Sequence, residues 1–319
     1  MKSELEKREI LLESGTNEVE IIEFYLGGQS FGINVHKLRE IVPYEPEAMT
    51  SLPESGPSMK GMLLLRGKTV PLVDLGSHLR KRQVENSVER KVVLVCEFNR
   101  EVNSFLVDGV NQIHRISWKD VKPLDDFFTP YKPRFTGCIT VDGREVMIVD
   151  LEHVITEIFP EQTIFGEGEV EGAEEADAFK RGSRQEVKIL VAEDSNIIRN
   201  QIVSILKSSG YEQVTSFVNG EECWNGLNML KAEAAHKGQD LREYADLLIS
   251  DIEMPSMDGL TLCKKIKTDP VMKELTVIMF SSLINEQLAH KCQEVGADGH
   301  ISKPQIHALV KMLDEYCLK

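Results

Sequence analysis

Acidic residues in the C-terminal half of the sequence follow short apolar segments that are typical of buried strands. Asp251 comes directly after L-L-I-S, and Glu193 and Asp194 follow V-K-I-L-V-A. Because ligands of open α/β sheets lie outside the carboxyl ends of the strands, we expect the carboxylates to converge there. Anions in one concavity repel one another unless a cation lies between them. Oxygen ligands favour a hard, hydrated ion, so the sequence predicts an Mg²⁺ site.

Further polar residues follow the next apolar segments of the same predicted sheet. Ser281 directly follows the apolar segment 275–280. Lys303 follows A-D-G-H-I-S and directly precedes Pro304. This set of groups suits phosphoryl transfer, with the Asp251 carboxylate as the nucleophile. The metal and Lys303 would neutralise phosphate oxygens, and Ser281 would donate a hydrogen bond. The sequence therefore predicts phosphorylation of Asp251.

The segment from about residue 187 to residue 319 resembles the receiver domain of bacterial two-component response regulators. The resemblance is carried by the acidic pair, by Asp251 and the M-P-S-M-D-G after it, by the S-S segment and by K-P. It implies a flavodoxin-like α/β fold with a five-stranded parallel sheet, as the alternating helix and strand patterns also indicate. It further implies that Asp251 is the phosphoacceptor, that Ser281 is the switch hydroxyl, and that the bond before Pro304 is cis.

Departures from the receiver pattern affect the expected switch and the lifetime of the phosphoryl group. Many receivers carry an aromatic residue that changes rotamer on activation, and this sequence has His300 at that position. The residue two positions after the phosphoacceptor commonly tunes hydrolysis, and here it is Glu253. A D-x-E pattern at Asp251 is also compatible with a phosphatase that uses an aspartyl intermediate, although such enzymes normally need a second Asp at that position.

Composition bounds the class of protein. The chain has 319 residues, enough for two ordinary domains, and its net charge of −15 disfavours nucleic acid as a partner. No apolar stretch approaches the roughly 20 residues that span a bilayer, and the N-terminus lacks the apolar stretch of a signal peptide. The cysteines are scattered without C-x-x-C, which predicts reduced, mostly buried thiols and no zinc site. We therefore expect a cytoplasmic protein that does not insert into the membrane.

The N-terminal half of the sequence reads as many short strands separated by turn residues. E-I-I-E-F-Y-L and Q-S-F-G-I-N-V flank Gly27-Gly28, which is typical of a hairpin. Residues 67–79 read G-K-T-V-P-L-V-D-L-G-S-H-L, and residues 143–155 read G-R-E-V-M-I-V-D-L-E-H-V-I. Each repeat contains a turn glycine, a buried strand and an aspartate placed to cap a helical turn. The pattern predicts an all-β barrel or sandwich built from two related half-units.

The same segment resembles the CheW family of chemotaxis coupling domains. The resemblance is carried in order by F-G-I-N-V-H-K-L-R-E-I, K-G-M-L-L-L-R-G-K-T-V-P-L-V-D-L, F-L-V-D-G-V and V-M-I-V-D-L. It implies a pair of small β-barrels that acts as a binding module without an active site. It also points to Arg66, and less directly to Leu38, Glu40 and Ile41, as the surface for receptors and kinase. The alternatives are a turn arginine satisfied by backbone carbonyls, and core positions for the apolar pair.

The domain organisation follows from these patterns. We expect an N-terminal tail or short helix at 1–17, a CheW-like domain at 18–160 and a receiver domain at 186–319. The intervening segment 161–185 begins with acids, glycines and alanines and no base, which favours a flexible tether. Within the receiver, the segment 220–244 is longer than a second helix and its loop usually are and predicts an extended, exposed helix end.

Together the two segments resemble CheV-type proteins. The resemblance implies a non-enzymatic chemotaxis scaffold that couples methyl-accepting chemoreceptors to a CheA-type histidine kinase and is regulated by phosphorylation of Asp251. It would be cytoplasmic and associated with membrane receptor arrays through protein contacts. An alternative within signalling is a phosphate sink that drains phosphoryl groups from the kinase. The alternative from another class is an aspartyl-phosphate hydrolase.

Overall fold

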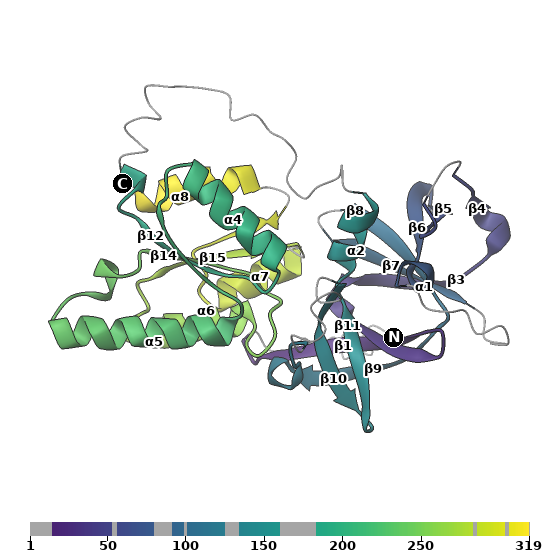
Figure 1. The fold of residues 1–319 in the computed structure, drawn as a ribbon, viewed down its shortest axis with the longest axis horizontal. Coiled ribbons are helices and arrows are strands. Elements are labelled where there is room, and N and C mark those ends of the chain that lie inside the picture. Colours follow the sequence, from purple (N-terminus) through teal and green to yellow (C-terminus); the bar gives the residue numbers. More distant parts are fainter. Residues whose placement is uncertain are drawn as a thin grey trace, which may run out of the picture.

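The chain folds into two domains that lie next to each other, with the N-terminal domain on the right and the C-terminal domain on the left in Figure 1. The computed structural model describes residues 15–52, 56–79, 91–98, 101–124, 134–159, 183–282, 286–303 and 306–318. Residues 1–14 of the expected tail, residues 161–182 of the expected tether, and Pro304 lie outside the described residues.

The first sheet of the N-terminal domain has five strands in the order β10-β11-β2-β1-β9. Its strands are β1 (Glu18–Leu26), β2 (Gln29–Asn34), β9 (Gly109–Ser117), β10 (Phe135–Val141) and β11 (Arg144–Val149). The predicted hairpin is formed by β1 and β2, which pair antiparallel from Leu26 and Gln29 onwards. The connecting Gly27 and Gly28 have φ values of 56° and 77°, a region that glycine adopts without steric cost.

The second sheet has six strands in the order β3-β7-β8-β6-β5-β4. Its strands are β3 (Leu38–Pro43), β4 (Met49–Thr50), β5 (Met59–Leu65), β6 (Lys68–Asp74), β7 (Val92–Phe98) and β8 (Glu101–Val107). Short 3-10 turns lie between strands, namely η1 (Val35–Lys37), η2 (Pro46–Ala48) and η3 (Trp118–Asp120). The alternating apolar side chains of both sheets pack inward, and Phe24, Phe31 and Phe105 are fully buried.

The sequence repeat corresponds to a structural repeat. β5 and β6 form one antiparallel hairpin, and β10 and β11 form another. β6 leads into α1 (Leu75–His78), and β11 leads into α2 (Leu151–Ile158). Asp74 and Asp150 cap these helices with their carboxylates, as the sequence predicts. The N-terminal domain therefore contains two related half-units.

The C-terminal domain is a five-stranded parallel sheet in the order β13-β12-β14-β15-β16. Its strands are β12 (Lys188–Ala192), β13 (Gln213–Phe217), β14 (Leu247–Ser250), β15 (Thr276–Ser281) and β16 (Gly299–Ser302). The helices are α4 (Asn196–Ser208), α5 (Gly220–Lys237), α6 (Gly259–Thr268), α7 (Glu286–Glu294) and α8 (Ile306–Cys317), and η7 spans Leu241–Glu243. This is the predicted flavodoxin-like α/β architecture. Helix α5 is 18 residues long, which accounts for the extended helix end.

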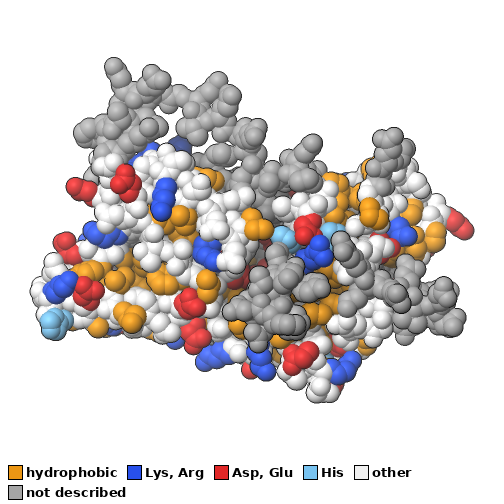
Figure 2. All heavy atoms as spheres, viewed as in Figure 1, with side chains coloured by type: hydrophobic (Ala, Val, Ile, Leu, Met, Phe, Trp, Pro, Cys, Tyr) orange, Lys and Arg blue, Asp and Glu red, His pale blue; other side chains and the backbone are white. Residues whose placement is uncertain are grey.

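The surface and composition show how charge and apolar groups are distributed. On the face seen in Figure 2, acidic and basic side chains are interspersed and do not gather into one basic patch. Among the described residues, none of the helices combines the length and the apolar character needed to cross a membrane. The six cysteines are free thiols, and four of them are buried.

Candidate functional site

The carboxyl edge of the parallel sheet brings the predicted site residues together. Ala192 of β12 pairs with Ser250 of β14, so Glu193 and Asp251 leave their strands at the same level. On the other side, Ser281 of β15 pairs with Ser302 of β16, and Lys303 follows directly. The register of neighbouring strands, and not the spacing along the chain, therefore places these side chains in one pocket.

The acidic cluster is compact and contains a lysine. One carboxylate oxygen from each of Glu193, Asp194 and Asp251 lies within 4.8 Å of the others. The Lys303 ammonium lies 3.0 Å from Asp251 Oδ2 and 3.1 Å from Glu193 Oε2. Glu193, Asp251 and Lys303 are each at most 5% exposed, so these interactions operate away from bulk solvent. Such a pairing is expected to hold the lysine charged.

Backbone and side-chain contacts fix the acidic loop between β12 and α4. The Arg199 guanidinium donates to the carbonyl oxygens of Glu193 and Asp194, at 2.7 Å and 3.3 Å. Ser195 caps α4 through its hydroxyl, which accepts from the Ile198 amide. Arg199 lies one turn into the helix and is buried, so it ties the helix to the loop that carries the acids.

Asp251 is oriented by its own loop. Its Oδ1 accepts a hydrogen bond of 2.7 Å from the Ile252 amide, which leaves Oδ2 directed to Lys303. The start of α6 packs so closely against this loop that a Cβ at Gly259 would lie 1.9 Å from the Asp251 carbonyl oxygen. The glycine of the M-P-S-M-D-G segment is thus required for the close approach of two backbones.

The electrostatics of the pocket favour a bound cation. Burial, together with the Asp251 charge, raises the pKa of Asp194 to about 8. Burial also raises the pKa of Asp251 to about 6, although Lys303 acts in the opposite direction. Lys303 is one positive charge facing three acidic groups, so negative charge remains uncompensated. An all-oxygen cluster with surplus negative charge fits Mg²⁺.

The N-terminal domain supplies one wall of this pocket. The cavity of about 30 Å³ beside Asp251 is lined by residues of both domains, among them Lys37 and Glu152 of the N-terminal domain. Glu152 Oε1 accepts a hydrogen bond of 2.5 Å from the Ser282 hydroxyl, directly after the predicted switch serine. Glu152 also forms an ion pair with Lys37, at 2.9 Å. Burial alone would raise the pKa of Glu152, but Lys37 and Lys303 lower it to about 2.

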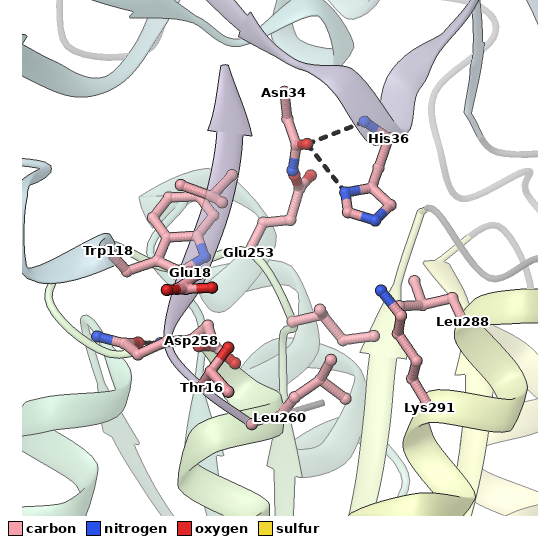
Figure 3. Close-up of a pocket in the computed structure, with 14 residues that line it drawn as sticks. Thr16, Glu18, Asn34, His36, Trp118, Glu253, Asp258, Leu260, Leu288 and Lys291 are labelled. Atoms are coloured by element: carbon pink, nitrogen blue, oxygen red, sulfur yellow. Dashed lines mark hydrogen bonds between the residues drawn. The ribbon is translucent and has the colours of Figure 1, made fainter. Parts of the chain in front are cut away.

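Glu253 is held by the opposite domain. Its carboxylate accepts a hydrogen bond from the Asn34 amide nitrogen and lies 3.1 Å from the Lys37 ammonium. Figure 3 shows the Glu253 side chain pointing across the domain boundary towards Asn34, whose oxygen faces His36. The residue two positions after Asp251 is therefore an interdomain contact in this structure.

Backbone groups extend the contact between the domains away from the acids. The Asn17 side chain donates to the Ser256 carbonyl at 3.0 Å and accepts from the Asp258 amide at 2.9 Å. The Ser256 amide donates to the Trp118 carbonyl at 3.0 Å. Asn17 has a φ of 61°, and Ser256 one of 66°. These contacts hold the loop after β14 against the N-terminal domain.

The remaining predicted residues of the receiver lie at or near this edge. Ser281 is buried at the end of β15, next to Ser282. His300 is half-buried on β16, where it pairs with Met279 in the strand register.

The predicted partner-binding residues lie in the second sheet of the N-terminal domain. Arg66 is at the turn between β5 and β6, its side chain is 81% exposed, and it forms an ion pair of 2.7 Å with Glu40 of β3. Ile41 is exposed, whereas Leu38 is half-buried and packs against the core. Arg66 thus bonds to a neighbouring carboxylate, and the apolar pair is divided between surface and core.

Sequence reasoning missed the residues that join the domains. The structure adds Asn17, Asn34, Lys37, Glu152 and Ser282 to the surroundings of the site. One available signal was the repeat itself, in which Gly76 and Glu152 hold the same position after the capping aspartate. Contacts between domains leave no short-range sequence pattern, so the other residues could not be identified from the sequence.

Comparison with known proteins agrees with this architecture. Residues 20–159 match the family described as CheW-like domain, and residues 189–314 match the family described as response regulator receiver domain. Fold and site thus define a CheW-like coupling domain joined to a receiver domain. We use these two names for the domains from here on.

Relatives of known name cover the whole chain or one domain. Chemotaxis protein CheV3 of Helicobacter pylori is 29% identical over 298 residues, covering 90% of this chain and 91% of that protein. Chemotaxis protein CheW of Rhizobium meliloti is 32% identical over 136 residues, covering 42% of this chain and 86% of that protein. Chemotaxis protein CheY1 of Helicobacter pylori is 31% identical over 118 residues, covering 37% of this chain and 86% of that protein. The chain has the domain architecture of the CheV proteins, and it is a chemotaxis coupling adaptor with a phosphorylatable receiver.

Proposed function

We propose that Asp251 accepts a phosphoryl group from a CheA-type histidine kinase, and that this changes how the protein couples methyl-accepting chemoreceptors to that kinase. The observation that carries the proposal is the position of the Lys303 ammonium, 3.0 Å from Asp251 Oδ2 within the cluster of acids. The protein would work in the cytoplasm, at receptor arrays, through protein contacts. The shared domain architecture supports these partners.

The transfer step uses Oδ2 of Asp251, the carboxylate oxygen that faces Lys303. Oδ2 forms the new P–O bond while the P–N bond of a phosphohistidine breaks, and the imidazole keeps the electron pair and takes up a proton from solvent. Lys303 stabilises the charge on the phosphoryl oxygens, and Ser281 donates a hydrogen bond to one of them. The Ile252 amide keeps Oδ1 in place during the step.

Glu193, Asp194 and Asp251 would hold Mg²⁺, and when bound the ion neutralises charge on the transferring group. Arg199 keeps the acidic loop in position for that purpose through its bonds to two backbone carbonyls. His300, on the strand next to Ser281, would replace the aromatic switch residue of other receivers.

The coupling domain acts as a scaffold and not as an enzyme. Arg66 forms an ion pair with Glu40 of β3, exposed Ile41 follows Glu40 on the same strand, and this region would contact receptor or kinase. Leu38 would support it from within because it packs on the core. Replacing Arg66 with alanine should weaken binding to receptor or kinase in a pull-down, with little change in stability because exposed pairs contribute under about 1 kcal/mol.

The alternatives are less well supported. An aspartyl-phosphate hydrolase needs a free acid two residues after the nucleophile, and Glu253 is occupied by Asn34 and Lys37. A phosphate sink needs only the receiver and gives no role to the contacts that tie the coupling domain to it.

Phosphotransfer provides the test. Wild type and Asp251→Asn are mixed with Mg²⁺ and phosphorylated CheA-type kinase, and the intact mass is measured. We expect one phosphoryl adduct on wild type and none on the variant. A sink would show transfer without any change in affinity for receptor or kinase, and absence of transfer to wild type would contradict the proposal.

A further inference from the structure

The coupling domain forms one wall of the space beside the phosphoacceptor. Asp251 is 5% exposed, and the cavity next to it, at about 30 Å³, has coupling-domain residues in its wall. A space of that size holds about two or three water molecules. The coupling-domain wall narrows the approach of a phosphohistidine or an acyl phosphate, so separation of the domains at this point gives the donor freer access to Asp251.

The contacts between the domains beside Asp251 include the Glu152 carboxylate, which lines the space that a phosphoryl group on Asp251 would enter. Glu152 reaches from the coupling domain to the Ser282 hydroxyl, at 2.5 Å. The adjacent Ser281 hydroxyl is the one expected to turn towards a phosphoryl group. Lys37 is the cation that holds Glu152 and Glu253 in this arrangement, at 2.9 Å and 3.1 Å.

Phosphorylation changes the balance of these contacts. A phosphoryl group on Asp251 carries about 1.5 to 2 negative charges in place of the single charge of the carboxylate, and it extends further into a buried pocket that already contains acids. It attracts Lys303 and the serine hydroxyls, and it repels the Glu152 carboxylate across the boundary. The contact at Ser282 is therefore stable only without the phosphoryl group.

We propose that Glu152 and Lys37 of the coupling domain form an autoinhibitory clamp on the receiver, and that phosphorylation of Asp251 expels Glu152 and separates the domains at this clamp. This inference rests on the proposed phosphorylation of Asp251. The clamp gives the receiver a direct route to the coupling domain that does not depend on the tether between them.

If the phosphoryl group weakens the clamp, then the clamp should also hinder phosphorylation of Asp251. If phosphorylation weakens the contact between the domains, then weakening the contact raises the population of the separated arrangement, in which Asp251 is more accessible. Removing an interdomain hydrogen bond far from the acids should therefore speed phosphorylation. Asn17 offers such a site because it contacts Ser256 and Asp258 and no acid of the pocket.

The experiment measures the rate of adduct formation with Mg²⁺ and acetyl phosphate by intact mass. The variants are Glu152→Gln and Asn17→Gly, the latter because glycine tolerates the positive φ at this position. The matched control is Glu157→Gln, at the other end of α2, where Glu157 binds His78 and Arg134 within the coupling domain. Small-angle X-ray scattering of wild type and Asp251→Asn, with and without acetyl phosphate, gives the radius of gyration.

We expect both interface variants to be phosphorylated at least about fivefold faster, because Glu152→Gln loses the charge that pairs with Lys37 and Asn17→Gly loses two interdomain hydrogen bonds, and we expect the control to match wild type. The radius of gyration of wild type should increase with acetyl phosphate, and that of Asp251→Asn should not. Wild type that becomes phosphorylated with no change in size and no gain of rate in either variant would overturn the clamp while leaving the proposed function intact. Wild type that takes up no phosphoryl group would overturn both.

Discussion

The two half-units of the coupling domain have the same design and different surroundings. In both, a hairpin leads to an aspartate that caps a helix, α1 after Asp74 and α2 after Asp150. Helix α1 has four residues and its second is Gly76, whereas α2 has eight and its second is Glu152. Only the Glu152 side chain forms a hydrogen bond to the receiver among the described residues of the two helices.

The difference shows how a repeated unit acquires a regulatory contact. The cap and the hairpin stabilise both halves. The second residue of the helix differs between the halves. In α2 it is Glu152, whose carboxylate reaches the receiver. We therefore expect signals from the receiver to reach α2 and to leave α1 unaffected.

Loss of Lys303 should have the largest effect, because without phosphorylation of Asp251 no signal reaches either α1 or α2. Lys303→Ala takes away the cation next to Asp251, and we expect the rate of phosphorylation to fall about a hundredfold, as for other groups that stabilise a transition state. Intact-mass kinetics with acetyl phosphate measure this effect. Lys311→Ala, at an exposed position of α8, is the control and should match wild type. An unchanged rate in a folded Lys303→Ala protein would show that the lysine does not act on the phosphoryl group.

The acids of the pocket should make the protein sensitive to Mg²⁺ and pH. Burial and repulsion raise the pKa of Asp194 to about 8, and burial raises that of Asp251 to about 6. The folded state then binds protons more tightly than the unfolded chain, so stability falls as pH rises towards 8, and a cation offsets this loss.

The increase in melting temperature with Mg²⁺ should accordingly be larger at pH 8 than at pH 6. The apparent Mg²⁺ affinity should rise by up to about tenfold per pH unit for each proton displaced. Asp194→Asn should lose most of this dependence. A Mg²⁺ effect that is equal at both pH values in wild type contradicts the assignment of the acids as ligands.

The helix caps give the smallest expected effect and compare the half-units directly. Asp150 accepts from the amides of Glu152 and His153, and Asp74 accepts from the amide of Ser77. Alanine at either position should lower the free energy of unfolding by about 1 to 2 kcal/mol, as measured by urea denaturation.

Only Asp150→Ala should also speed phosphorylation, because it loosens the start of α2 and thus the hold of Glu152. Asp74→Ala is the control for loss of a cap, and Asp150→Asn, which removes the charge that Asp150 adds to the pocket but keeps a side-chain oxygen for the cap, separates the electrostatic effect. Equal phosphorylation rates in the two alanine variants would show that α2 is not the element that closes the site.

The sequence predicts the acidic pocket well because its geometry follows from local rules. Asp251 and Lys303 each come at the end of an apolar segment, and parallel pairing then places them at one edge. The hairpins and caps follow from turn residues and aspartates in the same way. Lys37 and Glu152 were not found because their role depends on how two domains meet, which no periodicity encodes. Glu253 was identified as unusual, but its partner Asn34 is 219 residues away along the chain.

Hydrogen exchange of the two helices in one sample tests the central claim most directly. Wild type is labelled with Mg²⁺, with and without acetyl phosphate, and the peptides that contain α1 and α2 are compared by mass spectrometry. We predict faster exchange on phosphorylation at residues 34–37 and at the start of α2, and no change in α1, with Asp251→Asn unaffected throughout. Phosphorylated wild type in which α1 and α2 exchange as before would contradict the account.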